Sequence, residues 1–410
     1  MSEPWFAGAR LGMFVHWGLA SVHGCELSWP LIGTAMPALP SSQPIAVDDY
    51  YAAAEKFRPE PGSSRAWMRE ASAAGMTYAV LTTKHHEGYA LWPSAHTDFH
   101  HDRDLVAEFA DAARDEGLRV GFYFSLPDWH DPDYPAMQQG EGGYVAHVLR
   151  RSSPEAWARF LDRMFGQVRE LLTNYGAVDV LWFDGGWERT ADEWRADELR
   201  AMIRELQPGC LVNDRLPGHG DFDTPEQLVP AVPPARAWET CLTMNRSWGY
   251  VPDDHDYKSP TSLVHSVCEV AGRGGNLLLN VSPGPDGQLP AEQISRLSAL
   301  GTWMSAHAEA IHGTAAGLEP WQFYGPTTRS GDRVYLHLLA RPYESVTVRG
   351  VRVRRVRAVT HVASGTPLGW QPRLAAADEL GLAGDPVGEI VVEVPDECID
   401  DHATVIALDL

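Results

Sequence analysis

The sequence predicts an α/β fold: a (β/α) TIM-like barrel of seven to eight strands followed by a C-terminal β-sandwich. Short apolar runs alternate with amphipathic helical segments as far as residue 312, and each apolar run ends in polar or aromatic side chains. From about Trp321 onward the pattern changes to period-2 alternation without intervening helices. We therefore expect a catalytic barrel domain over residues 1–318 and a β-sandwich domain over residues 319–410.

The clearest barrel strand lies between Gly176 and the pair Gly185-Gly186. Residues 178–183 form an apolar and β-branched run with one interruption, which is typical of a strand buried on both faces of a parallel sheet. Alternation along a strand gives Trp182 and Asp184 the same direction, into the barrel. Asp184 ends the run, where such barrels keep their catalytic groups. The competing interpretation is an aspartate that only caps a loop or a helix.

Ahead of this strand, polar residues end three further strands. In chain order we expect a strand over 11–18 that ends in His16 and Trp17, a helix over 63–74, a strand over 78–86 that ends in His85 and His86, a helix over 104–116, and a strand over 119–125 that carries Tyr123. Irregular segments over 21–48 and 128–144 lie between them. The first is too long for a simple connector and contains Glu26 and Trp29, so we expect it to cover the same face.

The chain after Asp184 continues the same alternation and then changes to β-strands. We expect helices over 154–175, 192–206, 260–272 and 291–312, and barrel strands over 210–215, 237–241 and 276–281. The strand at 210–215 ends in Arg215, a flexible Pro-, Gly- and Asp-rich loop to residue 235 carries Glu226, and Glu239 lies on the strand at 237–241. In the sandwich we expect strands over 333–339, 345–349, 351–359, 389–394 and 404–408.

Composition excludes several classes of function. The net charge is −22, from 33 basic and 55 acidic side chains, so neither nucleic acid nor an anionic membrane is an expected partner. The five cysteines are scattered and odd in number, which predicts reduced core residues rather than disulfides or a thiolate metal site. The N-terminal residues lack a basic segment followed by an apolar one, which predicts a cytoplasmic enzyme. The sequence is compatible with a homo-oligomer.

Three chemistries could use polar groups gathered at the strand ends. A metal-dependent hydrolase needs His ligands on one side of an element, whereas His85 and His86 are adjacent and should diverge at strand geometry. A proton-abstracting lyase or isomerase needs a tuned base, and by the same alternation Lys84 points away. A glycosidase needs two carboxyl groups with hydroxyl-binding and aromatic partners, which the sequence supplies. This pattern favours a glycosidase over the other two chemistries.

At these positions the chain resembles the α-L-fucosidases of glycoside hydrolase family 29. The motifs that carry the resemblance are Gly12-Met-Phe-Val-His16-Trp17-Gly18, Thr83-Lys84-His85-His86-Glu87-Gly88, Leu181-Trp182-Phe183-Asp184-Gly185, Trp238-Glu239-Thr240-Cys241, Ser247-Trp248-Gly249-Tyr250 and Gly275-Asn276-Leu-Leu-Leu-Asn280-Val. They agree in order and spacing from residue 5 to about residue 310. The resemblance implies a retaining exo-hydrolase that releases terminal α-L-fucose from a fucosylated oligosaccharide or glycoconjugate. It also implies that the reaction needs no metal and no organic cofactor.

The resemblance also implies roles for individual residues. Asp184 matches the nucleophile, and Glu226, 42 residues later, lies close to the usual offset of the acid/base, with Arg215 as a nearby partner. Glu239 is the alternative acid/base or a substrate-binding group. Substrate contacts are expected from His16, Trp17, His85, His86, Tyr123, Trp182, Arg215 and Trp248, the last beside the C6 methyl group, and from Glu26 or Trp29. The sequence leaves two alternatives: a fucose- or galactose-binding module that has lost turnover, and a metal-dependent barrel hydrolase.

Overall fold

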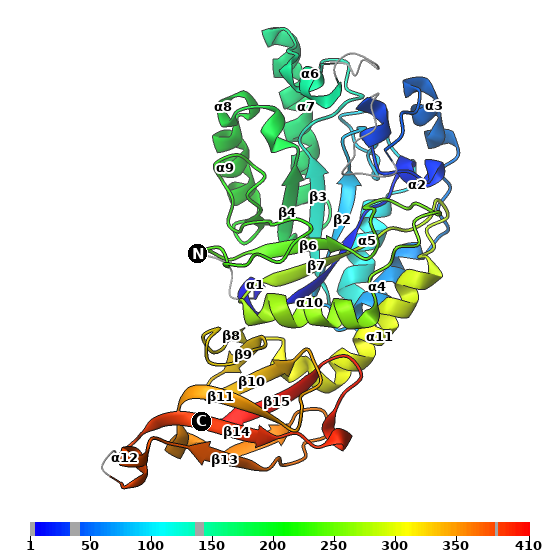
Figure 1. Cartoon of the computed structure of the whole chain (residues 1–410). Coiled ribbons are helices and arrows are strands. Elements are labelled where there is room, and N and C mark those ends of the chain that lie inside the picture. The colour runs from blue at the N-terminus through cyan, green and yellow to red at the C-terminus, as the bar shows by residue number, and fades with distance from the viewer. Residues whose placement is uncertain (1–4, 33–41, 136–142, 382–383) are drawn as a thin grey trace.

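The computed structural model describes residues 5–32, 42–135, 143–381 and 384–410. Its larger part is a curved parallel sheet surrounded by helices, above a smaller β-domain (Figure 1). This arrangement confirms the predicted TIM-like barrel and C-terminal sandwich. The barrel strands are β1 Leu11–Val15, β2 Tyr78–Lys84, β3 Arg119–Ser125, β4 Val180–Asp184, β5 Leu211–Val212, β6 Glu239–Thr243 and β7 Asn276–Val281. The sheet order is β5-β4-β3-β2-β1-β7-β6.

The register of the sheet places Asp184 at its carboxyl edge. All five residues of β4 are buried, as expected for a parallel strand covered on both faces. β4 pairs with β3 from Val180, opposite Gly121, to Asp184, opposite Ser125. Asp184 is therefore the last paired residue of a rigid element, and its backbone carbonyl accepts the N–H of Leu126.

An extended segment over residues 221–227 lies between the two edge strands of the seven-stranded sheet. It forms isolated parallel bridges to the end of β5 on one side and to β6 on the other, including one between Glu226 and Cys241. The Asp221 N–H donates to Val212 O (2.7 Å), and the Gln227 N–H donates to Cys241 O (3.0 Å). This segment occupies the eighth position of the barrel. Glu226 lies, as expected, on the connection between β5 and β6, and the backbone beside it is bonded to β6.

Helices cover the outside of the barrel. Three of the longer ones begin at side-chain caps: Asp104, Ser153 and Ser259 each accept a backbone N–H of the first turn, the last two followed by proline. The helices are α1 Phe6–Ala9, α2 Leu19–His23, α3 Val47–Tyr51, α4 Ser63–Ala73, α5 Leu105–Asp115, α6 Gly143–Leu149, α7 Pro154–Thr173, α8 Ala191–Trp194, α9 Ala196–Leu206, α10 Pro260–Gly272, α11 Ala291–His307 and α12 Ala376–Glu379.

Some predicted elements differ from those observed. The helix expected over 192–206 is divided into α8 and α9, because Arg195 has a left-handed backbone conformation (φ 51°). The segment 21–48, expected to be irregular, begins within α2 and contains a 3₁₀ turn at Trp29–Ile32; residues 33–41 lie outside the described part. None of the helices in the described ranges is both long and apolar enough to cross a bilayer.

The C-terminal region consists of a five-stranded sheet, β12-β15-β10-β9-β8, packed on a three-stranded sheet, β11-β14-β13. Strands β10 and β15 are buried on both faces: Val405 and Ala407 pack into the barrel core, while Ile406 and Leu408 pack into the sandwich core. The strands are β8 Ala315–Ala316, β9 Thr327–Ser330, β10 Arg333–Leu338, β11 Ser345–Arg352, β12 Ala358–His361, β13 Trp370–Arg373, β14 Val387–Glu393 and β15 Thr404–Asp409. The five cysteines are free and buried, as predicted.

A glycine after β4 lets two stretches of backbone approach closely. A Cβ atom at Gly186 would lie 2.0 Å from the carbonyl oxygen of Arg215, so no side chain fits without displacing the chain that follows β5. We expect Gly186→Ala to destabilise the protein by about 1–3 kcal/mol, as overpacking usually does. Thermal unfolding measures the effect, and Gly384→Ala, where a Cβ meets nothing within 4 Å, is the matched control. Equal midpoints for both variants would contradict this explanation.

Candidate active site

A cavity of about 100 Å³ opens at the carboxyl ends of the barrel strands. Most of the side chains that line it come from the strands or from the segments that follow them. Leu27 and Trp29 come instead from the loop after α2. Its lining residues are Phe14, His16, Leu27, Trp29, His85, Tyr123, Trp182, Asp184, Trp187, Arg215, Glu226, Cys241 and Trp248. A small, deep and mixed polar and aromatic cavity suits a single small ligand rather than an extended polymer.

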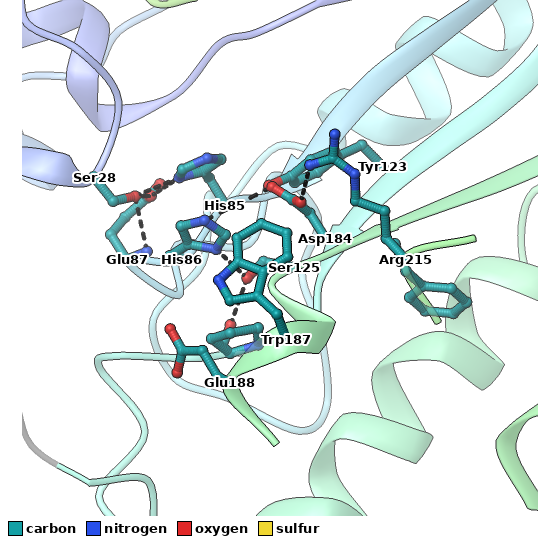
Figure 2. Close-up of polar contacts among 12 residues, drawn as sticks. Ser28, His85, His86, Glu87, Tyr123, Ser125, Asp184, Trp187, Glu188 and Arg215 are labelled. Atoms are coloured by element: carbon teal, nitrogen blue, oxygen red, sulfur yellow. Dashed lines mark hydrogen bonds and ion pairs between the residues drawn. The ribbon is translucent and has the colours of Figure 1, made fainter. Parts of the chain in front are cut away.

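Two carboxylates share one guanidinium group at this cavity. Figure 2 shows the contact of Arg215 with one of them, Asp184. Arg215 Nη1 donates to Asp184 Oδ1 (2.8 Å), and Arg215 Nη2 donates to Glu226 Oε2 (2.6 Å). The second oxygen of Asp184 accepts the hydroxyl of Tyr123 (2.8 Å). The carboxylates predicted from the sequence are therefore neighbours, Asp184 held at both oxygens and Glu226 partly exposed at the rim.

The surroundings of Arg215 keep it charged. Burial lowers the pKa of its guanidinium, but the carboxylates of Asp184 and Glu226 raise it, and the net result is a pKa above the ordinary value. The guanidinium also lies over two indole rings, 4.9 Å from the centroid of Trp182 and 5.6 Å from that of Trp187. A planar guanidinium can lie over aromatic rings while two of its nitrogens donate to two different carboxylates. The single ammonium group of lysine cannot do both.

Three imidazoles at the site are oriented through their Nδ1 atoms. His16 Nδ1 contacts Asn280 Oδ1 (2.6 Å), and Asn280 uses its amide nitrogen to donate to Trp248 O. His85 Nδ1 contacts Ser28 Oγ (2.6 Å), and His86 Nδ1 contacts the hydroxyl of Ser125 (2.6 Å). Because each serine hydroxyl donates its own proton elsewhere, both imidazoles donate from Nδ1.

Two of these imidazoles are neutral acceptors. Burial, with the neighbouring His85, lowers the pKa of His16 to about 3, and burial likewise lowers the pKa of His86 well below its ordinary value. With the proton on Nδ1, each Nε2 carries a lone pair. His86 Nε2 is buried 3.8 Å from Asp184 Oδ2 and has no hydrogen-bond partner among the described residues. A buried acceptor that faces a second acceptor needs a donor, which a water molecule or a ligand hydroxyl group can supply.

The expectation that His85 and His86 diverge was wrong. Their ring centroids are 4.1 Å apart, and the candidate ligand atoms of His85, His86 and Asp184 all lie within 4.8 Å of one another. Strand alternation does not apply because β2 ends at Lys84 and its register with β3 already shifts after Thr82. A metal ion at this cluster would nevertheless have to compete with the guanidinium and the phenol that bond to Asp184. Lys84, as expected, points elsewhere, to Asp128 (2.9 Å).

Glu239 lies beneath the cavity and does not line it. Its carboxyl group is fully buried, accepting the hydroxyl of Tyr78 and the indole N–H of Trp182 (3.0 Å). Burial raises the pKa of Glu239 to about 7, although both hydrogen bonds lower it. The residue orients Trp182, whose ring stacks on Tyr123 at 5.6 Å.

Three other residues predicted to contact substrate are not among those that line the cavity: Glu26, Trp17 and His86. Glu26 is buried, and its two oxygens accept the backbone N–H of Trp248 (2.9 and 3.0 Å), so it is Trp29 of this loop that lines the cavity. Trp17 donates its indole N–H to Gly284 O (2.8 Å) and packs edge-on against core rings. It follows His16 directly, and its side chain turns to the opposite side of the chain.

The sequence prediction missed four cavity residues. Phe14, Leu27 and Cys241 are apolar or weakly polar, and nothing in their type separates them from the core. Trp187, half exposed, stands three residues after Asp184 on the 3₁₀ turn Gly186–Glu188. Its closeness in sequence to Asp184 was the one signal available.

Comparisons with known proteins agree with this geometry. A model of the α-L-fucosidase family matches residues 1–309. Tissue α-L-fucosidase of Bos taurus is 30% identical over 374 residues, which cover 82% of this chain and 75% of that protein. The structure of α-L-fucosidase isoenzyme 1 from Paenibacillus thiaminolyticus superposes with a TM-score of 0.86 at 38% identity, covering 99% of this chain and 98% of that one. A trapped covalent intermediate of a family 29 α-L-fucosidase mutant from Bacteroides thetaiotaomicron, formed with 2-fluoro-fucosyl fluoride, superposes with a TM-score of 0.83 at 27% identity, over 99% and 95% of the two chains.

The raised pKa of Glu239 makes a prediction about stability. The folded protein holds this proton up to about pH 7, whereas the unfolded chain releases it near the ordinary value of 4.5. Stability contributed by this group is therefore present below pH 4.5 and is lost as the pH rises to 7. Relative to Glu239→Gln, we expect the free energy of unfolding of the wild type to fall through this window, by up to about 1.4 kcal/mol per pH unit.

Urea unfolding at several pH values measures this difference. Glu205→Gln, on the exposed surface of α9, is the control and should run parallel to the wild type. If the wild type and Glu239→Gln also keep a constant difference from pH 4.5 to 7, Glu239 does not hold its proton in the folded state.

Proposed function

The chain belongs to the α-L-fucosidase family, and from this premise we propose that it is a retaining exo-glycosidase that hydrolyses terminal α-L-fucosyl residues from oligosaccharides or glycoconjugates. The observation that carries the proposal is the pair of carboxylates, Asp184 and Glu226, joined through Arg215 at the mouth of one small cavity. A retaining glycosidase needs two such groups, about 5–5.5 Å apart, on opposite sides of the scissile bond.

In the first step Asp184 attacks the anomeric carbon of fucose. The bond from that carbon to the leaving oxygen breaks, and the leaving oxygen takes a proton from Glu226. In the second step Glu226 removes a proton from water, the water oxygen attacks the anomeric carbon, and the bond to Asp184 breaks. Fucose is released, and both carboxyl groups return to their initial states.

The structure supports the assignment of Asp184 as nucleophile. The residue ends a fully buried strand, and hydrogen bonds from Tyr123 and Arg215 fix both carboxylate oxygens. Such preorganisation holds an attacking oxygen in one position without a further ordering cost.

The surroundings of the two glutamates favour Glu226 as the acid/base. Its side chain is 39% exposed at the cavity rim, where a leaving group and then water can reach it. Glu239 is fully buried, and both of its oxygens are already hydrogen-bonded. A proton donor must reach the leaving oxygen directly or through one water, which Glu226 can do.

The polar and apolar groups of the cavity suit a deoxy-sugar. The neutral Nε2 atom of His16 can accept a hydroxyl proton, and Trp182 offers a ring face. His86 does not line the cavity, but its neutral Nε2 lies 3.8 Å from Asp184 Oδ2, next to the lining. Phe14, Leu27 and Trp248 add an apolar portion to the lining, suited to the C6 methyl group of fucose.

Replacing the nucleophile tests the proposal directly. We expect Asp184→Ala or Asp184→Gly to lower kcat on 4-nitrophenyl α-L-fucoside by at least about 10³-fold, because the covalent route is lost. Added azide or formate should restore part of the activity by attacking from the vacated position. Turnover within a few fold of the wild type would remove Asp184 from this role, and strong inhibition of the wild type by EDTA would favour the metal-dependent alternative.

The acid/base is tested by the dependence on leaving group. We expect Glu226→Ala to lower kcat/KM on natural fucosides by about 10²–10⁴-fold, because their leaving oxygen needs a proton. Cleavage of aryl fucosides with acidic phenols should suffer much less. Glu239→Ala is the comparison. If only this variant loses activity on natural fucosides while keeping it on aryl fucosides, Glu239 and not Glu226 is the acid/base.

A further inference from the structure

The cavity lining divides into a buried floor and a more accessible rim. The side chains of His16, His85, Tyr123, Trp182 and Trp248 are buried. The rim consists of Trp29, Trp187, Arg215 and Glu226, of which Trp187 is 50% exposed. Because an exo-glycosidase encloses the sugar that it releases and leaves the remainder of the glycan outside, the floor is suited to fucose and the rim to its leaving group.

Trp187 occupies the side of the rim on which the leaving group departs. Arg215 lies over the Trp187 ring and donates to Glu226 through the same guanidinium. Glu226 is the group proposed to protonate the leaving oxygen, so the atoms attached to that oxygen emerge beside it. Of the two indole rings under this guanidinium, Trp182 is buried and Trp187 is half exposed, so Trp187 is the one that offers an exposed apolar face.

The Trp187 ring is held by a chain of hydrogen bonds that leads to a buried carboxylate. Its Nε1 donates to the hydroxyl of Tyr144 on α6 (2.8 Å), and that hydroxyl donates to Glu188 Oε1 (2.9 Å). Glu188 is buried, and its other oxygen accepts the hydroxyl of Tyr134. The ring of Tyr144 also packs edge-on against Trp29, at 5.3 Å between centroids. One tyrosine thus contacts both aromatic residues of the rim.

We propose that Trp187 forms the leaving-group subsite, on which the first sugar of the remaining glycan stacks through its apolar face. This inference rests on the proposed fucosidase function and deepens it. An indole ring held at its nitrogen is a rigid platform that loses little conformational entropy on binding. Tyr144 is a positioning residue, because it acts on the leaving group only through Trp187 and Trp29.

The test compares two substrates that differ only in the leaving group. α-L-Fucosyl fluoride has the same sugar but no ring to stack. The second substrate is a fucosyl disaccharide, chosen as the fastest for the wild type from 1,2-, 1,3-, 1,4- and 1,6-linked members. We expect Trp187→Ala to lower the ratio of kcat/KM for disaccharide over fluoride by about 10-fold, in line with the free energy of an aromatic contact.

Two further variants separate stacking from simple destabilisation. Trp187→Phe keeps a ring and should restore most of the ratio. Tyr144→Phe keeps the ring against Trp29 but loses the hydroxyl, so we expect a higher KM for the disaccharide with little change in kcat. Trp321→Ala removes another exposed tryptophan (66%), in the C-terminal domain, and is the matched control.

The outcomes are distinguishable. Suppose that the wild type hydrolyses both substrates. If Trp187→Ala then lowers both kcat/KM values by the same factor, or lowers neither, the leaving-group subsite is not at Trp187. This conclusion holds whether or not the variant has a lower thermal midpoint. If the wild type hydrolyses no fucosyl substrate, it is the proposed function that fails.

Discussion

The bridge that Arg215 forms between Asp184 and Glu226 is the interaction on which the rest of the site depends. Two carboxyl groups at the mouth of one small cavity repel each other whenever both are ionised, and the repulsion grows as water is excluded. The guanidinium offsets it and fixes the two groups relative to each other, since each binds a different nitrogen of one planar group. Stacking on Trp182, which the buried carboxyl group of Glu239 orients, fixes the guanidinium in turn.

The barrel builds this bridge from three separate stretches of chain. Asp184 ends β4, Arg215 follows β5, and Glu226 lies on the segment that joins β5 to β6. Gly186 allows the first two stretches to touch, because any side chain there would collide with the carbonyl of Arg215. The parallel sheet therefore does more than supply a scaffold: its closure at residues 221–227 is what brings the second carboxylate to the first.

Much of this could be predicted from the sequence, because strand ends of a parallel barrel meet at one face. Asp184, His16, His85 and Tyr123 follow that rule. It gave less beyond the strand ends: Trp17 turned into the core, and His86 turned toward His85. Sequence patterns also do not show which carboxylate is buried and satisfied by partners, and this is the property that separates Glu239 from Glu226. Trp187 was missed because its place at the cavity depends on contacts with Arg215 and with Tyr144, the latter 43 residues away in the chain.

The central claim is that Asp184 attacks the sugar and carries it covalently. Incubation with 2-fluoro-fucosyl fluoride, followed by proteolysis and peptide mass mapping, measures this most directly. We expect the fluorofucosyl group on the carboxylate of Asp184, with a slowly recovering activity as the intermediate hydrolyses. An adduct on Glu226 or Glu239, or inactivation without any covalent adduct, would contradict the account.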